Sequence, residues 1–121
     1  DTVLLGTPGG GLDHALWLTC LDEDLAVMPD GAATLIGPRG LRLSGGQIQR
    51  AGAARALVRH PQLLVVDDLS SALDVDTEAR LWDRVTDGGF ETALLVSHRP
   101  HVLARADRVV VLDAGRVVDV A

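Results

Sequence analysis

The hydrophobic pattern along the second half of the chain alternates between helical periodicity and short apolar runs. A helix is predicted from about Ser44 to His60, because Ser44 is a good N-cap and Pro61 cannot continue a helix. Its apolar stripe is expected from Ile48, Ala51, Leu57 and Val58. The wholly apolar run Leu63–Val66 follows, and its composition is typical of a strand buried on both faces of a parallel sheet.

The same alternation continues to the end of the sequence. A helix capped by Asp74 is predicted to run to about Val85 and to end at the turn formed by residues 87–89. A second buried strand is predicted over residues 92–96, and a short helix near residues 100–105. Strands at 108–112 and 117–120, joined by the turn at 113–116, form an expected hairpin.

The first forty residues predict helices and loops rather than strands. Residues 7–11 read as a flexible break, and a helix with apolar positions at Leu12, Ala15, Leu16 and Leu18 follows it. The acidic run 22–24 opens or caps a second short helix, which ends before the turn at 29–31. Residues 31–42 are expected to form an irregular loop. Together these elements predict an α/β fold, with a mostly parallel sheet, flanking helices and a small helical subdomain.

Composition narrows the class of protein further. The 121 residues correspond to one domain or part of one, and the 47% apolar content excludes a disordered chain. The net charge of −6 argues against a nucleic-acid partner. No apolar run is long enough to cross a bilayer, and the single Cys20, expected in the core, allows no disulfide within the chain.

One consequence of the composition concerns phosphate binding. All 11 basic residues are arginines, so the chain has no lysine and cannot contain the phosphate-binding loop G-x-x-x-x-G-K-[ST]. Nevertheless, residues 43–50 read Leu-Ser-Gly-Gly-Gln-Ile-Gln-Arg. A helix that opens on Ser44, Gly45 and Gly46 presents backbone N–H groups and the positive end of its dipole to an anion. The segment therefore predicts contact with a phosphate.

Titratable residues follow two of the predicted strands. Asp67 and Asp68 come directly after the run Leu63–Val66, and His98 follows the strand 92–96. Ligands of open α/β sheets gather at the carboxyl ends of strands, and a strand ending in Asp is a common way to hold the water shell of Mg²⁺. A turn or helix-capping role explains two aspartates equally well, so this pair alone is weak support for a nucleotide site.

Taken in order, these motifs resemble the C-terminal half of an ATP-binding cassette (ABC) ATPase domain of the exporter type. Residues 43–47 match its signature motif, residues 63–68 its Walker B strand and residues 71–74 its D-loop. His98 is similar to its switch histidine, and residues 34–40 to the loop that contacts the membrane domain. The resemblance covers nearly the whole chain. It divides the chain into a helical subdomain at about 1–60 and part of the catalytic core at 61–121.

The resemblance implies a composite ATP site between two cassettes packed head to tail. Ser44, Gly45, Gly46 and Gln47 would contact the γ-phosphate of ATP bound by the partner cassette. Asp67 would position Mg²⁺, and Asp68 would act on the attacking water. His98 would contact the γ-phosphate, and Asp74 would couple the two sites. The implied partners are a second ATPase domain and a transmembrane domain, which would place the chain at the cytoplasmic face of a membrane.

Two departures from the family pattern leave alternatives open. The Walker A loop and the Q-loop glutamine are absent from this sequence, so an isolated chain is expected to be inactive and to bind nucleotide weakly. Asp68 also stands where the family usually has Glu, which shortens the reach by roughly 1 Å, and such a displacement can cost about 100-fold in rate. A catalytically weak regulatory module of a heterodimeric transporter, or a soluble non-transport ABC ATPase, are the alternatives.

Overall fold

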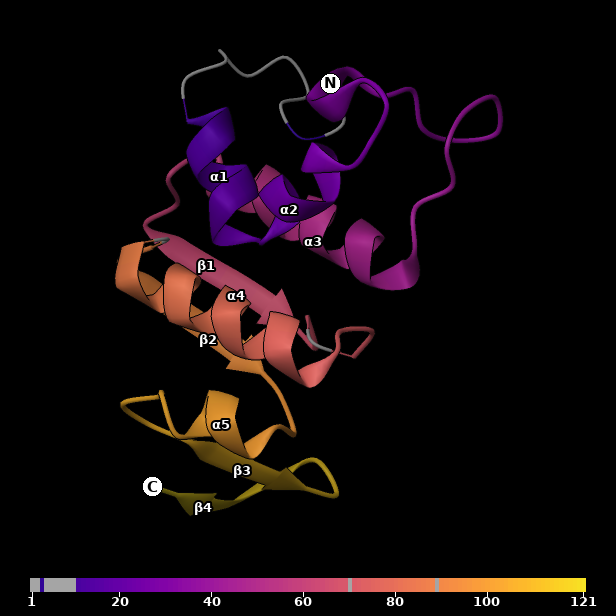
Figure 1. Cartoon of the computed structure of the whole chain (residues 1–121). Helices are drawn as coiled ribbons and strands as arrows, with labels where there is room; N and C mark the ends of the chain where they lie inside the picture. Colours follow the sequence, from indigo (N-terminus) through magenta and orange to yellow (C-terminus); the bar gives the residue numbers. More distant parts are fainter. Residues whose placement is uncertain (1–2, 4–10, 70, 89) are drawn as a thin grey trace.

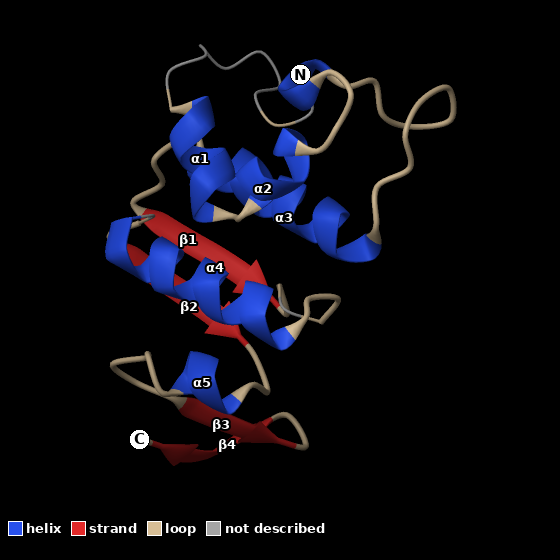
Figure 2. Cartoon of the chain, in the orientation of Figure 1, coloured by secondary structure: helices blue, strands red, loops and turns tan. Residues whose placement is uncertain are grey.

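The computed structural model describes residues 3, 11–69, 71–88 and 90–121. Most of the predicted break at 7–11, and Gly89 of the predicted turn at 87–89, lie outside the described residues. The helices and strands follow one another down the molecule, from three helices at one end to a hairpin at the other (Figures 1 and 2). Among the described residues, no helix is long and apolar enough to span a membrane.

Among the described residues before the first strand, the regular elements are helices, as predicted. The helix α1 covers Leu12–Leu18, α2 covers Leu21–Ala26 and α3 covers Gly45–Leu57. The predicted loop between α2 and α3 contains a single 3₁₀ turn, η1, at Gly31–Ala33. Both α1 and α2 pack against α3, so the signature-like segment begins a helix that is held within a small helical layer.

The central part of the chain is a β-α-β unit. Strand β1 covers Leu63–Asp67, helix α4 covers Val75–Gly88 and strand β2 covers Thr92–Val96. β1 and β2 pair in parallel, with Leu63 opposite Thr92 and Asp67 opposite Val96. Helix α4 lies along one face of this pair (Figure 1). The predictions for both strands and for the connecting helix are confirmed.

The prediction that these strands are buried on both faces is wrong for the described residues. Leu64 is buried, and Ala93 and Leu95 pack on the core, but the alternate positions point away from it. Their exposed fractions lie between 53% and 63%, for Leu63, Val65, Leu94 and Val96. Successive side chains of a strand point to opposite faces. Only every second residue of each apolar run therefore packs on the core, and the other face of the strand pair is exposed.

The end of the chain forms the predicted hairpin. Helix α5 covers Pro100–Leu103, and strands β3 (Val110–Asp113) and β4 (Arg116–Val120) pair antiparallel. The expected mostly parallel sheet is therefore only partly correct. The described strands form one parallel pair and one separate antiparallel pair.

The hydrophobic core lies between the helices and the inner face of β1. Trp82 and Leu81 of α4 are almost fully buried there, as is the predicted core residue Cys20. The predicted apolar stripe of α3 is correct for Ala51 and Leu57, and Val58 just after the helix is also buried. It is wrong for Ile48, which is 60% exposed. The face of α3 that packs on its neighbours instead includes Arg50, whose aliphatic stem is buried with the core.

Candidate functional site

The first turn of α3 is closed by a reciprocal capping box. The Ser44 hydroxyl accepts a hydrogen bond from the Gln47 backbone N–H at 3.2 Å. The Gln47 side-chain oxygen accepts one from the Ser44 N–H at 2.8 Å. These two bonds fix Ser44 at the start of the helix, where the next N–H groups have no partner within the helix. Ser44 and Gly45 are exposed, so the predicted phosphate-contacting segment is open to a ligand.

The two glycines of this turn meet different surroundings. A Cβ on Gly46 would lie 2.8 Å from the Ala72 carbonyl oxygen, so only glycine fits against that backbone. A Cβ on Gly45 would lie 3.6 Å from the Ala72 Cβ, which is an ordinary contact. Gly46 is therefore needed for packing within the chain. The chain itself places no such demand on Gly45.

Helix α3 also holds the D-loop-like segment, residues 71–74, through Gln49. The Gln49 side-chain nitrogen donates to the Ser71 hydroxyl at 2.7 Å, and its oxygen accepts from the Ala72 N–H at 3.4 Å. Together with the Gly46 contact, these bonds join the two predicted motifs within one chain. The sequence places Gln49 on the predicted helix but gives no sign of this role.

Asp74 ends that segment as the predicted cap of α4. Its carboxylate accepts a hydrogen bond from the Thr77 N–H at 3.0 Å. Hydrogen bonds from the side chain and the backbone of Thr77 hold the pKa of Asp74 below its ordinary value. Asp74 is exposed at the start of α4.

The parallel register brings the remaining candidate residues to one edge. Asp67 lies opposite Val96, and the Asp68 N–H donates to the Val96 carbonyl at 2.9 Å. His98 follows Val96 by two residues, so both strands deliver their polar residues to the same end. Asp67, Asp68 and His98 are all exposed.

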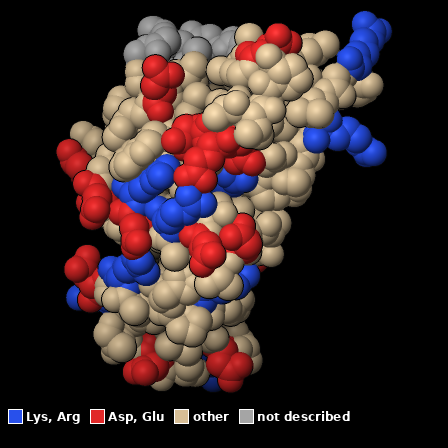
Figure 3. Space-filling view, in the orientation of Figure 1, with Lys and Arg blue, Asp and Glu red and all other residues tan. Residues whose placement is uncertain are grey.

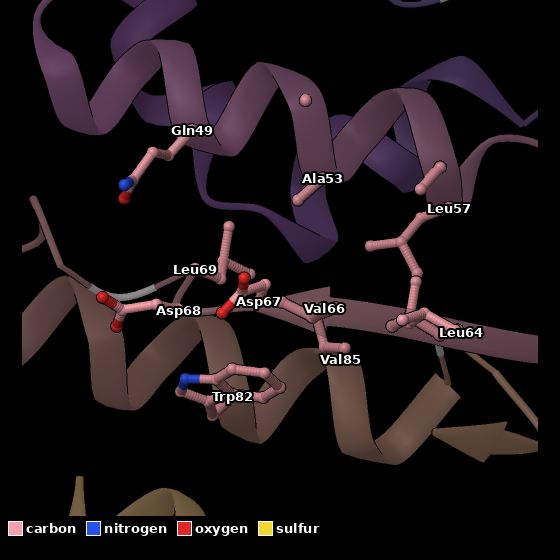
Figure 4. A pocket seen from close by; sticks show the side chains of 13 residues that line it. Gln49, Ala53, Leu57, Leu64, Val66, Asp67, Asp68, Leu69, Trp82 and Val85 are labelled. Carbon is pink, nitrogen blue, oxygen red and sulfur yellow. The ribbon is translucent and has the colours of Figure 1, made fainter. Parts of the chain in front are cut away.

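Asp68 has an unusual backbone conformation. Its φ is +49°, in the left-handed region that Asp tolerates better than most residues. This turn directs the chain away from β1 directly after Asp67. A cleft of about 270 Å³ lies beside it, between α3 on one side and β1 with α4 on the other (Figure 4). Gln49 and Asp67 line that cleft at its polar end, and Leu57 and Leu64 at the other.

The segment after His98 is anchored by a buried carboxylate that sequence analysis missed. Glu78 of α4 is fully buried, with its Oε1 3.3 Å from His101 Nε2 and its Oε2 3.6 Å from Arg99 Nη1. These contacts tie two residues that follow His98 to α4, the helix that Asp74 caps. The available signal in the sequence was a Glu one helical turn after a capping Asp, but its partners Arg99 and His101 lie far along the chain.

The loop before the signature-like segment has a closed shape. Ile36 and Leu41 form an isolated bridge, and the Leu41 N–H donates to the Leu35 carbonyl at 2.9 Å. Gly40 is required in this closure, because a Cβ there would overlap the Leu35 carbonyl. Leu35 is 65% exposed at the surface of this loop, together with Arg39 and Arg42.

The residues at the strand edge fit a Mg²⁺ ion that is bound mainly by phosphate and water. Among the described residues, no group of three or more His, Cys, Asp or Glu is placed to hold a metal by itself. Mg²⁺ commonly uses only one or two carboxylates, with substrate phosphates and water as its other ligands. An exposed Asp67 at the end of β1 matches that donor set.

The solved structures give the class of protein that this fold and site resemble. The chain superposes on a bacterial Atm1-family ABC exporter with ATP bound, with a TM-score of 0.80 and 33% identity. The match covers 95% of this chain and 20% of that one. The predicted resemblance to ABC transporter ATP-binding proteins is thereby confirmed.

Particular relatives share sequence along nearly all of the chain. The mycobactin import ATP-binding/permease protein IrtB of Mycolicibacterium smegmatis is 42% identical over 98% of the chain. The ATP-dependent lipid A-core flippase of Burkholderia orbicola is 42% identical over 87% of it. The chain spans about a fifth of the length of these curated relatives, at 21% and 18%. No protein-family model matches it.

Proposed function

We propose that this chain is part of an ATP-binding and ATP-hydrolysing subunit of an ABC transporter, of the exporter type. The observation that carries the proposal is the parallel register of β1 and β2, which brings Asp67, Asp68 and His98 to one edge. The similarity to ATP-binding/permease proteins supports the transport role. In this role the chain adopts part of a P-loop NTPase fold, with residues 1–60 as its helical subdomain and 61–121 in its catalytic core.

The residues have separate roles in this proposal. Ser44, Gly45, Gly46 and Gln47 form the signature end that meets the γ-phosphate of ATP on a partner cassette. The structure favours contact through backbone N–H groups and the Ser44 hydroxyl, because the Gln47 amide already bonds within the chain. Asp74 lies at the start of α4, where it would couple the two composite sites.

The catalytic roles fall to the strand edge. Asp67 would hold Mg²⁺, which offsets phosphate charge. Asp68 accepts a hydrogen bond from the attacking water and orients it toward the γ-phosphorus. His98 donates to a γ-phosphate oxygen as charge develops there. The subunit would lie at the cytoplasmic face of a membrane, against a transmembrane domain that contacts the loop at 34–40.

ATP turnover by the full-length protein with its partner tests this assignment. Ser44→Arg fills the open signature turn with a long side chain, and His98→Ala removes the γ-phosphate donor. Each variant is expected to lower turnover by about 100-fold or more, the loss typical of a missing transition-state donor. Arg108 is exposed and has no role in the proposed site. Arg108→Ala therefore serves as a control that should leave turnover unchanged. Turnover unaffected by both site variants would exclude the proposal.

A second candidate function is a regulatory module with little hydrolysis of its own. The observation that favours it is the carboxylate at position 68, which is one methylene shorter than the usual Glu and sits on a left-handed turn. Asp68→Glu restores the reach and is expected to raise turnover by about 10- to 100-fold if geometry limits the rate. No increase would count against the regulatory role.

A further inference from the structure

The acidic run 22–24 joins α2 to two other helices through different residues. Glu23 pairs with Arg80, and Asp22 lies 3.4 Å from Arg84, so these two acids face α4. Asp24 faces α3 instead, where it contacts the signature-like helix. Figure 3 shows acidic and basic side chains interleaved across the middle of this face of the molecule. The contacts of Asp24 therefore set it apart from its two neighbours.

Asp24 accepts hydrogen bonds from two residues of α3. Its Oδ1 lies 2.8 Å from Gln47 Nε2, and its Oδ2 lies 2.6 Å from Arg50 Nη1. The same Arg50 nitrogen donates to the Cys20 carbonyl at 2.8 Å. Arg50 is nearly buried, and Asp24 is only partly exposed. The carboxylate is thus fixed from two sides at the start of α3.

These contacts determine which way the Gln47 amide points. A carboxylate can only accept hydrogen bonds, so the NH₂ end of Gln47 must face Asp24. The oxygen end then faces the Ser44 N–H, which donates to it at 2.8 Å. A continuous chain of hydrogen bonds therefore runs from Asp24 through Gln47 to the backbone of Ser44.

We propose that Asp24 is a positioning residue for the signature turn, acting on Ser44 through the orientation of the Gln47 amide. The inference rests on the proposed function only for its effect on ATP. Asp24 does not touch the phosphate site itself. It sets the geometry of the residue that does, from a helix twenty positions earlier in the sequence.

A pair of substitutions tests this chain of hydrogen bonds. In Asp24→Asn, Arg50 retains the side-chain oxygen of residue 24, so the new NH₂ group faces the Gln47 NH₂. Gln47 must then turn its oxygen toward residue 24, which leaves its NH₂ facing the Ser44 N–H. Adding Gln47→Glu restores every donor and acceptor pairing, with the same net charge as the parent protein.

The experiment measures two quantities in the full-length protein with its partner. Hydrogen exchange of peptides covering residues 41–50, without nucleotide, reports on the signature turn. The kcat and KM for ATP report on its use. Asp24→Asn is expected to speed exchange and lower kcat/KM, each by about 3- to 10-fold, the effect of one net hydrogen bond. The double variant should return exchange to within about twofold of the parent, and Asp22→Asn, which removes the same charge from α2, should change neither exchange nor kcat/KM.

The outcomes separate this inference from the proposed function. If Ser44→Arg abolishes turnover but Asp24→Asn leaves exchange and kcat/KM at parental values, the positioning role is wrong. It is also wrong if adding Gln47→Glu fails to restore the exchange of Asp24→Asn, since the lost ion pair between Asp24 and Arg50 would then explain the defect. If Asp24→Asn does not fold, recovery of folding in the double variant supports the role, and its absence contradicts it. If exchange responds as expected while Ser44→Arg and His98→Ala both leave turnover intact, the proposed function fails and the positioning of Ser44 stands.

Discussion

At the scale of single residues, the two glycines of the signature turn separate packing from ligand contact. Gly46 is enclosed by the Ala72 carbonyl, whereas the Gly45 position leaves room for a methyl group. The motif predicts phosphate contact for both glycines, because it cannot reveal which glycine faces another segment of the same chain. The structure gives Gly46 an additional reason to be glycine.

This difference predicts opposite results for two matched substitutions. Gly46→Ala should lower the free energy of unfolding by about 1–3 kcal/mol, because the new methyl group overlaps backbone. Gly45→Ala should leave stability unchanged or raise it by up to about 1 kcal/mol, while lowering ATP turnover. Denaturation and turnover measured on the same preparations check both. Equal destabilisation by the two variants would contradict the assignment.

At the scale of elements, the sequence predicted the order and type of helices and strands correctly. Local signals were sufficient for this: Ser44 caps α3, Asp74 caps α4, and β1 ends at Asp67. The burial of the strands was predicted less well. Whether Val65 and Leu94 face a second layer depends on tertiary partners, and an apolar run carries no information about them.

The network around Asp24 could not be predicted for a similar reason. Three consecutive acids at a helix start are expected from the helix dipole alone. Their division between α3 and α4 depends on the way α2 packs, which brings Gln47 and Arg50 to residue 24. Likewise, the contacts of Glu78 with residues 99 and 101 form only once α5 is placed beside α4.

The link between α2 and α3 predicts a specific acid sensitivity. Burial by itself would raise the pKa of Asp24, but hydrogen bonds from Arg50 and Gln47 hold it below its ordinary value. A lowered pKa in the folded state means that the carboxylate stabilises the fold above about pH 4, and that this contribution is lost as the pH falls through the folded pKa. Thermal unfolding of the parent and of Asp24→Asn should therefore differ most at pH 6–7 and converge toward pH 3. A constant difference across this range would contradict the account.

At the scale of the whole molecule, the proposed function assigns two surfaces of the chain to a composite ATP site. The start of α3 presents Ser44 and Gly45, and the end of the β1–β2 pair presents Asp67, Asp68 and His98. The two are joined through residues 71–74, which bond to Gln49 and lead into α4. In the proposed function, the phosphate met by Ser44 belongs to ATP that another cassette holds.

ATP turnover by mixed assemblies of full-length subunits shows whether the signature of one subunit acts on ATP held by the other. One subunit carries Ser44→Arg, and the defect in the phosphate-binding loop lies either on its partner or on the same subunit. If the signature acts on the partner's ATP, splitting the two defects between subunits leaves one complete site and about half of the activity. Placing both on one subunit then damages both sites and abolishes turnover. The reverse result, with activity retained only when both defects share a subunit, would contradict the account.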